Sequence, residues 1–169
     1  MFTRQFPFLC FIVSFVYLTG CGQQTPKDIP KLYPAHITVQ NGGSPIADTT
    51  VFLIPQGGTS GNWSTMGVTN ASGVAVITTS QGGWKSNGVP EGTYKVYIRK
   101  IPEVHQDPLP DHLKGDPEAM EKHADEYRRL LQNAPKIIPE KLTTPVQSPL
   151  TLTVSTSGTA ELTVDVSKY

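Results

Sequence analysis

Short stretches of alternating apolar and polar residues run through most of the chain from residue 35 onward. The alternation recurs in five places: residues 35–39, 74–78, 94–99, 150–154 and 160–166. Clusters of Gly, Asn, Ser and Pro separate these stretches, as at residues 41–45 and 70–73. A period of two is typical of strands with one buried face, and such clusters are typical of turns. About seven short strands with frequent turns predict an all-β fold, a two-sheet sandwich.

Three regions refine this prediction. Residues 50–54 are β-branched or apolar throughout, which indicates a central strand. Residues 81–92 contain four glycines and are expected to be irregular. The alternating stretches 150–154 and 160–166 flank the turn cluster Ser155–Gly158, so we interpret them as a closing hairpin.

One segment has helical rather than strand periodicity. Asp116, Pro117 and Glu118 form a helix start, with a side-chain acceptor, a first-turn proline and an acid at the positive end of the dipole. Apolar residues then recur at spacings of four and three on one predicted face: Met120, Ala124, Tyr127, Leu131 and Ala134. Opposite charges four residues apart are expected to pair: Glu118–Lys122, Lys122–Glu126 and Asp125–Arg129. The sequence predicts one short helix that ends near Asn133, inside an insertion spanning about residues 102–140.

The first 21 residues have the pattern of an export signal that ends at a lipid attachment site. Arg4 supplies the positive start, residues 6–17 are almost wholly apolar, and Leu18–Cys21 reads Leu-Thr-Gly-Cys, which resembles a lipobox. The apolar run is shorter than the roughly 20 residues that span a bilayer. Because a cysteine thiolate is a strong nucleophile, we predict cleavage before Cys21 and acylation of its thiol, with palmitate among the acyl chains. An ordinary cleaved signal and an N-terminal anchor helix are the alternatives.

Charge and cysteine content narrow the remaining function classes. The chain has 14 basic and 14 acidic residues, so there is no basic excess for binding nucleic acid. It has two cysteines, of which Cys10 lies in the predicted signal and Cys21 at the predicted lipid site, so no disulfide is expected in the mature domain. Gly22 after the cysteine is not an acidic retention signal, and we leave open the outer membrane and the periplasmic face of the inner membrane.

Three stretches resemble a known domain. Residues 41–55 read Asn-Gly-Gly-Ser-Pro-Ile-Ala-Asp-Thr-Thr-Val-Phe-Leu-Ile-Pro, which looks like the entry of a carboxypeptidase regulatory-like (transthyretin-like) domain. Thr69–Gly73 and Val89–Val96 stand where that family has Thr-Asp-Ala-Asp-Gly and Pro-x-Gly-x-Tyr-x-Val. The tail from residue 138 to 151 is similar to small lipoproteins of planctomycete bacteria. The resemblance covers about residues 33–166 and implies a prealbumin-like (Ig-like) β-sandwich on a lipid anchor. Asn70 and Ser72 depart from the family's acids, which puts cation binding at that turn in doubt.

Candidate binding residues are few. Trp63, Trp84 and Tyr97 could form an aromatic platform for a sugar or peptide if at least two rings lie exposed and roughly coplanar on one face. The alternative is one core tryptophan and one loop tryptophan. His105 and His112 are weak metal candidates among nearby acids, and their spacing matches no metal motif, so we expect no metal or other cofactor. The sequence contains no Gly-x-Ser-x-Gly elbow, and no phosphate-binding glycine loop opens a helix. We therefore expect no enzymatic activity and no catalytic residues.

Together these patterns predict three parts: a signal peptide over residues 1–20, a flexible polar tether over 21–32, and the β-sandwich with its helical insertion over 33–169. We expect a lipoprotein held at the cell envelope by acylated Cys21, serving as a non-catalytic structural or interaction module. The alternative is a carbohydrate- or peptide-binding module. The expected partners are the lipid bilayer and envelope proteins or glycans, and no nucleic acid.

Overall fold

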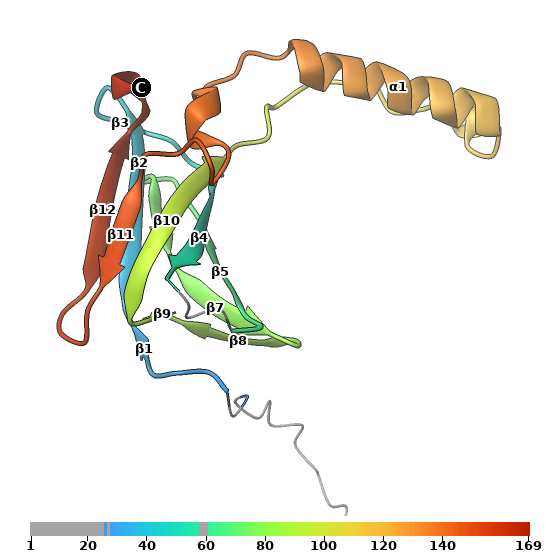
Figure 1. The fold of residues 1–169 in the computed structure, drawn as a ribbon. Helices are drawn as coiled ribbons and strands as arrows, with labels where there is room; N and C mark the ends of the chain where they lie inside the picture. Colours follow the sequence, from blue (N-terminus) through green and yellow to red (C-terminus); the bar gives the residue numbers. More distant parts are fainter. Residues whose placement is uncertain (1–25, 27, 58–60) are drawn as a thin grey trace, which may run out of the picture.

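A computed structural model describes residues 26, 28–57 and 61–169. These residues form an all-β sandwich of two principal sheets with a helical arm (Figure 1). The larger sheet has the spatial order β11-β10-β4-β5-β7-β8, and its strands are β4 (Thr50–Gln56), β5 (Ser64–Val68), β7 (Thr78–Gln81), β8 (Trp84–Asn87), β10 (Gly92–Arg99) and β11 (Thr151–Val154). The predicted fold class, all-β with one short helix, is therefore confirmed.

The smaller sheet is organised around β2 (Ala35–Asn41). Its neighbours are β3 (Ser44–Pro45), β6 (Val74–Val76) and β12 (Ala160–Asp165). A separate antiparallel pair joins β1 (Leu32–Tyr33) to β9 (Val89–Pro90). Three 3-10 turns complete the elements: η1 (Asp111–Leu113), η2 (Glu140–Leu142) and η3 (Val166–Lys168).

The core lies between the two sheets and follows the predicted alternation. In β10, Tyr94, Val96 and Ile98 are buried, whereas Lys95 and Tyr97 are partly exposed. The remaining strands contribute the same kind of inward residues, including Ile37, Val39, Val51, Leu53, Leu152, Val154 and Val164. Burial of these apolar side chains is the main favourable term for the fold.

The predicted closing hairpin is wrong. β11 pairs with β10 in the larger sheet, whereas β12 pairs with β2 in the smaller sheet, in parallel, with Leu162 opposite Ile37. The link through Ser155–Gly158 therefore crosses from one sheet to the other. Both strands bury one face against the same core, so their alternation is identical in either arrangement and does not reveal the strand that each one pairs with.

The segment 81–92, expected to be irregular, contains strands instead. Gly82 and Gly83, both with positive φ, form a tight turn that pairs β7 with β8, placing Gln81 opposite Trp84. Gly88 then lets β9 approach β1, since a Cβ at this position would lie 2.9 Å from the Tyr33 carbonyl oxygen. The glycines thus serve a hairpin and a close backbone approach rather than an irregular loop.

Buried hydroxyl groups fasten the loops to the sheets. The Thr69 hydroxyl donates to the Ile46 carbonyl at 2.7 Å and accepts from the Thr49 amide at 2.9 Å. The Ser148 hydroxyl donates to the Val96 carbonyl at 2.5 Å, which ties the return from the arm to β10. A buried polar group without a partner is costly, so these bonds fix loop positions as well as adding stability.

The arm extends from the end of β10 and contains the helix α1 (Pro117–Asn133), which ends where predicted. The Asp116 side chain accepts hydrogen bonds from the Glu118 and Ala119 amides, as an N-cap residue does. The helix has no buried residue. Within the described part of the helix, Asp125 forms an ion pair with Arg128, three residues later in the sequence, and not with Arg129 as predicted. No helix in the described part of the chain is long and apolar enough to cross a membrane.

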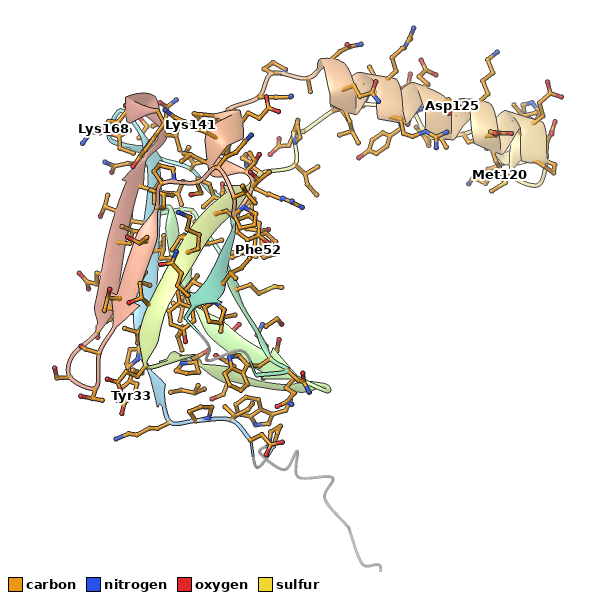
Figure 2. The ribbon with its side chains drawn as sticks, in the orientation of Figure 1. Tyr33, Phe52, Met120, Asp125, Lys141 and Lys168 are labelled. Carbon is orange, nitrogen blue, oxygen red and sulfur yellow. The ribbon has the colours of Figure 1, made fainter. Side chains whose placement is uncertain are left out.

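The apolar face of α1 is only partly covered. An extended segment of the arm runs back along the helix, where Gln106 donates to the His123 carbonyl at 2.8 Å and the His123 ring lies 2.9 Å from the Asp107 carbonyl. Met120 and Tyr127, on the predicted apolar face, remain 54% and 41% exposed. The arm is therefore a local hairpin of helix and extended chain that stands away from the sandwich (Figures 1 and 2).

Candidate functional site

The sandwich has two distinct ends, and the candidate sites are divided between them. Tyr33 lies at the end where the chain enters from the N-terminus, whereas Lys141 and Lys168 lie at the opposite end, near the root of the arm (Figure 2). β10 connects the two ends: it begins next to β9, which pairs with β1, and it finishes at Arg99, where the arm starts. The molecule therefore presents its arm at the end opposite the N-terminal entry.

Trp63 and Trp84 meet in one shallow depression near the N-terminal entry. Its volume is about 560 Å³, and its wall also contains Ser64, Ser80, Gln81 and Lys85. Both indole rings are partly exposed, so neither fills the sandwich core. The strand pairing explains part of this proximity. Gln81 on β7 is opposite Trp84 on β8, and β5 begins directly after Trp63.

Two buried polar atoms in this depression have no hydrogen-bond partner among the described residues. They are the Trp63 Nε1 donor and the Gln81 Oε1 acceptor. Position 61 accepts only glycine in this arrangement, because a side chain at Gly61 would overlap the Trp63 ring. The tryptophan depression thus combines two aromatic surfaces with one donor and one acceptor that are unsatisfied within the described chain.

Tyr97, the third predicted aromatic, belongs to a different surface. Its ring stacks on Phe52 with centroids 4.7 Å apart and planes 9° apart, and the Arg99 guanidinium lies 5.5 Å from the Tyr97 ring centroid. Tyr97 is opposite Phe52, and Phe52 is opposite Met66, across three adjacent strands of the larger sheet. The structure therefore brings together two of the three predicted aromatics and assigns the third to the outer face of the sheet.

The histidines of the arm do not converge on a shared site. His105 pairs with the neighbouring Asp107, with Nε2 and Oδ1 3.4 Å apart and both side chains more than 90% exposed. His112 lies in η1 and is exposed. Within residues 26, 28–57 and 61–169, no group of three or more His, Cys, Asp or Glu side chains is placed to hold a metal ion.

The shifted ionisable groups have structural partners. Burial raises the pKa of Tyr94 to about 12, and its hydroxyl donates to the Pro90 carbonyl at 2.8 Å. Hydrogen bonds from the Gly42 amide and from Ser167 lower the pKa of the partly exposed Asp165. Each group therefore fastens a loop or turn to a neighbouring strand.

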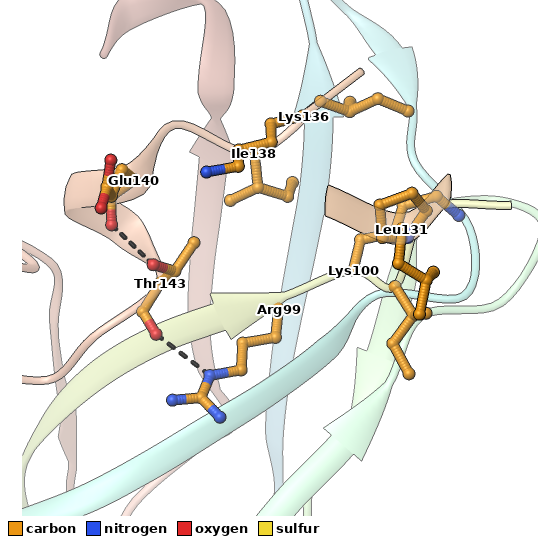
Figure 3. A pocket seen from close by; sticks show the side chains of 10 residues that line it. Arg99, Lys100, Leu131, Lys136, Ile138, Glu140 and Thr143 are labelled. Atoms are coloured by element: carbon orange, nitrogen blue, oxygen red, sulfur yellow. Dashed lines mark hydrogen bonds between the residues drawn. The ribbon is translucent and has the colours of Figure 1, made fainter. Parts of the chain in front are cut away.

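A second cavity, which the sequence analysis missed, lies at the root of the arm (Figure 3). Its volume is about 370 Å³, and it is formed by the chain leaving β10, the chain returning from α1, and Leu131 of the helix. Its basic residues are Arg99, Lys100 and Lys136, and its main apolar residues are Ile101, Ile137 and Ile138. The available signal was weak: an Arg-Lys-Ile sequence just before the insertion and a Lys-Ile-Ile sequence near its end.

Cys21, the predicted lipid attachment residue, lies outside the described residues, as do the predicted signal peptide and half of the predicted tether. The chain matches no family model, and no curated protein or solved structure is significantly similar to it. The functional argument therefore depends on the residues and geometry of this chain.

Proposed function

We propose that this protein is a bacterial envelope lipoprotein, acylated on Cys21, whose non-catalytic β-sandwich resembles the carboxypeptidase regulatory-like class and acts as a structural or interaction module. The Leu-Thr-Gly-Cys sequence after an apolar run supports acylation. Two or three acyl chains would hold the protein durably, because each buried methylene contributes about 0.8 kcal/mol.

The observation that carries the interaction role is the separation of the two ends of the sandwich. β10 has eight residues between the N-terminal entry and the arm. At about 3.3 Å per residue, this strand places the root of the arm roughly 25 Å from the entry. An N-terminal lipid anchor would then lie at one end of the sandwich, and the arm, with Met120 and Tyr127 exposed, would be presented at the other.

The chemistry of the described residues supports a non-catalytic role. Among the described residues, Tyr94 and Asp165, whose pKa values are shifted, hold turns in place and line neither of the two cavities described above. A catalytic acid or base is usually a perturbed group within a cleft, and neither residue fits that description.

Processing of the precursor tests the proposed anchor. Cys21→Ser, expressed in a lipoprotein-producing bacterium, should accumulate as uncleaved precursor that takes up no labelled palmitate. Cys10→Ser is the matched control, since it makes the same change within the predicted signal and should be processed normally. Cleavage of Cys21→Ser at the wild-type rate would reject the proposed anchor.

The tryptophan depression favours a second candidate function, binding of a carbohydrate or peptide. Trp63 and Trp84 supply aromatic surface, and the unpaired Trp63 and Gln81 atoms could exchange hydrogen bonds with a hydroxyl or amide after a small side-chain shift. Trp84→Ala should abolish retention on an envelope-glycan or peptide array, whereas Tyr97→Ala, on the other surface, should retain it. Equal loss in both variants would exclude the tryptophan depression as the binding site.

A further inference from the structure

The cavity at the root of the arm combines an apolar wall with an excess of positive charge. Two segments about 35 positions apart in sequence supply most of the wall, since Ile101 follows β10 and Ile137 precedes η2. Ile101 is 75% exposed and Ile137 is 49% exposed, so apolar surface faces solvent at the rim. The volume of about 370 Å³ lies in the range of small-ligand sites.

The charges around this cavity are not balanced by the protein. Arg99, Lys100 and Lys136 line it, with Glu140 as the acidic residue of the wall. The Arg99 Nε donates to the Thr143 carbonyl at 3.2 Å (Figure 3), and the Lys100 ammonium donates to the Ala47 carbonyl at 2.8 Å. None of the recorded ion pairs of the described residues involves these three cations. Three cations against one acid leave this wall with a net positive charge.

We propose that this cavity binds a small carboxylate carried on a short apolar body. A carboxylate would form charge-assisted hydrogen bonds with Arg99 and Lys136, because a guanidinium and an ammonium are its usual partners. The apolar body would cover Ile101, Leu131 and Ile137, which removes exposed apolar surface from water. Neither a neutral apolar molecule nor a small polar anion would use both features of the cavity.

Hexanoate is a suitable probe because it carries the charge and the apolar body and is soluble in water. The full-length protein in nanodiscs of zwitterionic lipid is titrated with carboxyl-¹³C hexanoate and observed by NMR. We expect saturable binding with a dissociation constant of about 1 mM, typical of so few atoms. Acetate and hexanol, which each lack one feature, should bind at least fivefold more weakly. Hexanol binding as tightly as hexanoate would overturn the proposal.

Substitution of an exposed lysine locates the site. Lys136→Met removes one cation from the wall and should weaken hexanoate binding about fivefold, as expected for a partly exposed charged contact. Lys122→Met is the matched control, because it makes the same change on an exposed face of α1 away from the cavity. Ile137→Ser should also weaken binding, through the apolar wall. Equal affinities in all three variants and the wild type would overturn the proposal.

The natural source of the carboxylate is distinguished by a second ligand. N-acetyl-Gly-Leu has a free C-terminal carboxylate next to a branched apolar side chain. The same peptide with an amidated C-terminus lacks the charge and serves as the control. Tighter binding of the peptide acid than of hexanoate would support the proposal and identify a peptide C-terminus as the source. Tighter binding of hexanoate would support it with a free aliphatic acid as the source. The peptide amide binding as well as the peptide acid would overturn the proposal.

Discussion

The sandwich and the arm are stabilised in different ways. The sandwich buries 19 apolar residues in one core cluster, among them Ile37 and Val96 with no exposed surface. The helix of the arm buries none, and it is held by the Asp116 cap and by contacts of His123 with the arm's own extended segment. The fold of the sandwich thus depends on packing, whereas the arm depends on local hydrogen bonds.

This difference separates a rigid part from an adaptable part. A helix without a packed face is marginal at this length, and its opening has little effect on the rest of the molecule. Met120 and Tyr127 are therefore presented by an element that can adjust to a partner without disturbing the sandwich. Four changes test the separation, from the largest expected effect to the smallest.

Ile37→Ala should destabilise the whole sandwich by about 3 kcal/mol, because it leaves a cavity at a fully buried position. Met120→Ala, at an exposed position of the arm, should change the free energy of unfolding by less than about 0.5 kcal/mol. Urea unfolding followed by near-UV circular dichroism measures both. Similar losses in the two variants would mean that the helix contributes to the common core.

Thr69→Val should cost about 2 kcal/mol, because the Ile46 carbonyl and the Thr49 amide lose their buried partner. Thr163→Val is the matched control at an exposed position of β12 and should be nearly neutral. The same urea experiment applies. A neutral effect of Thr69→Val would show that these two backbone groups have another way to be satisfied.

Asp116→Ala should lower the stability of the helix by about 1 kcal/mol through loss of the N-cap. Amide hydrogen exchange should then accelerate about fivefold in residues 117–123 and stay unchanged in β10. Asp111→Ala, in η1, removes an acid of the same arm without removing the cap and serves as the control. Faster exchange in β10 of Asp116→Ala would contradict the independence of the arm.

The smallest effect concerns Asp165, whose carboxylate accepts hydrogen bonds from the Gly42 amide at 2.9 Å and from the Ser167 hydroxyl at 2.8 Å. Because these bonds lower the pKa of Asp165, their contribution is complete above the unfolded pKa of about 3.9 and is lost as the pH falls through the lower folded value. NMR titration should move the Gly42 amide with a midpoint below 3.9. A midpoint at or above 3.9 would refute this role, and Asp165→Asn should remove the transition.

Sequence patterns predicted individual elements better than their partners. The alternation of Tyr94, Val96 and Ile98 indicates a buried face directly, and the cap at Asp116 marks the start of the helix, because both signals are local. The pairing of β12 with β2 joins residues over 120 positions apart, and no local pattern encodes it. The same reason explains the candidate sites. Trp63 and Trp84 line one depression only through the pairing of β5, β7 and β8, and Arg99 and Lys136 line one cavity only through the geometry of the arm.

The proposed lipid anchor at Cys21 is tested most directly by the intact mass of the native protein. The account predicts a chain that begins at Cys21 and carries the added mass of a diacylglycerol, with or without a third acyl chain. A chain that begins at another residue, or a Cys21 thiol without acyl mass, would contradict it.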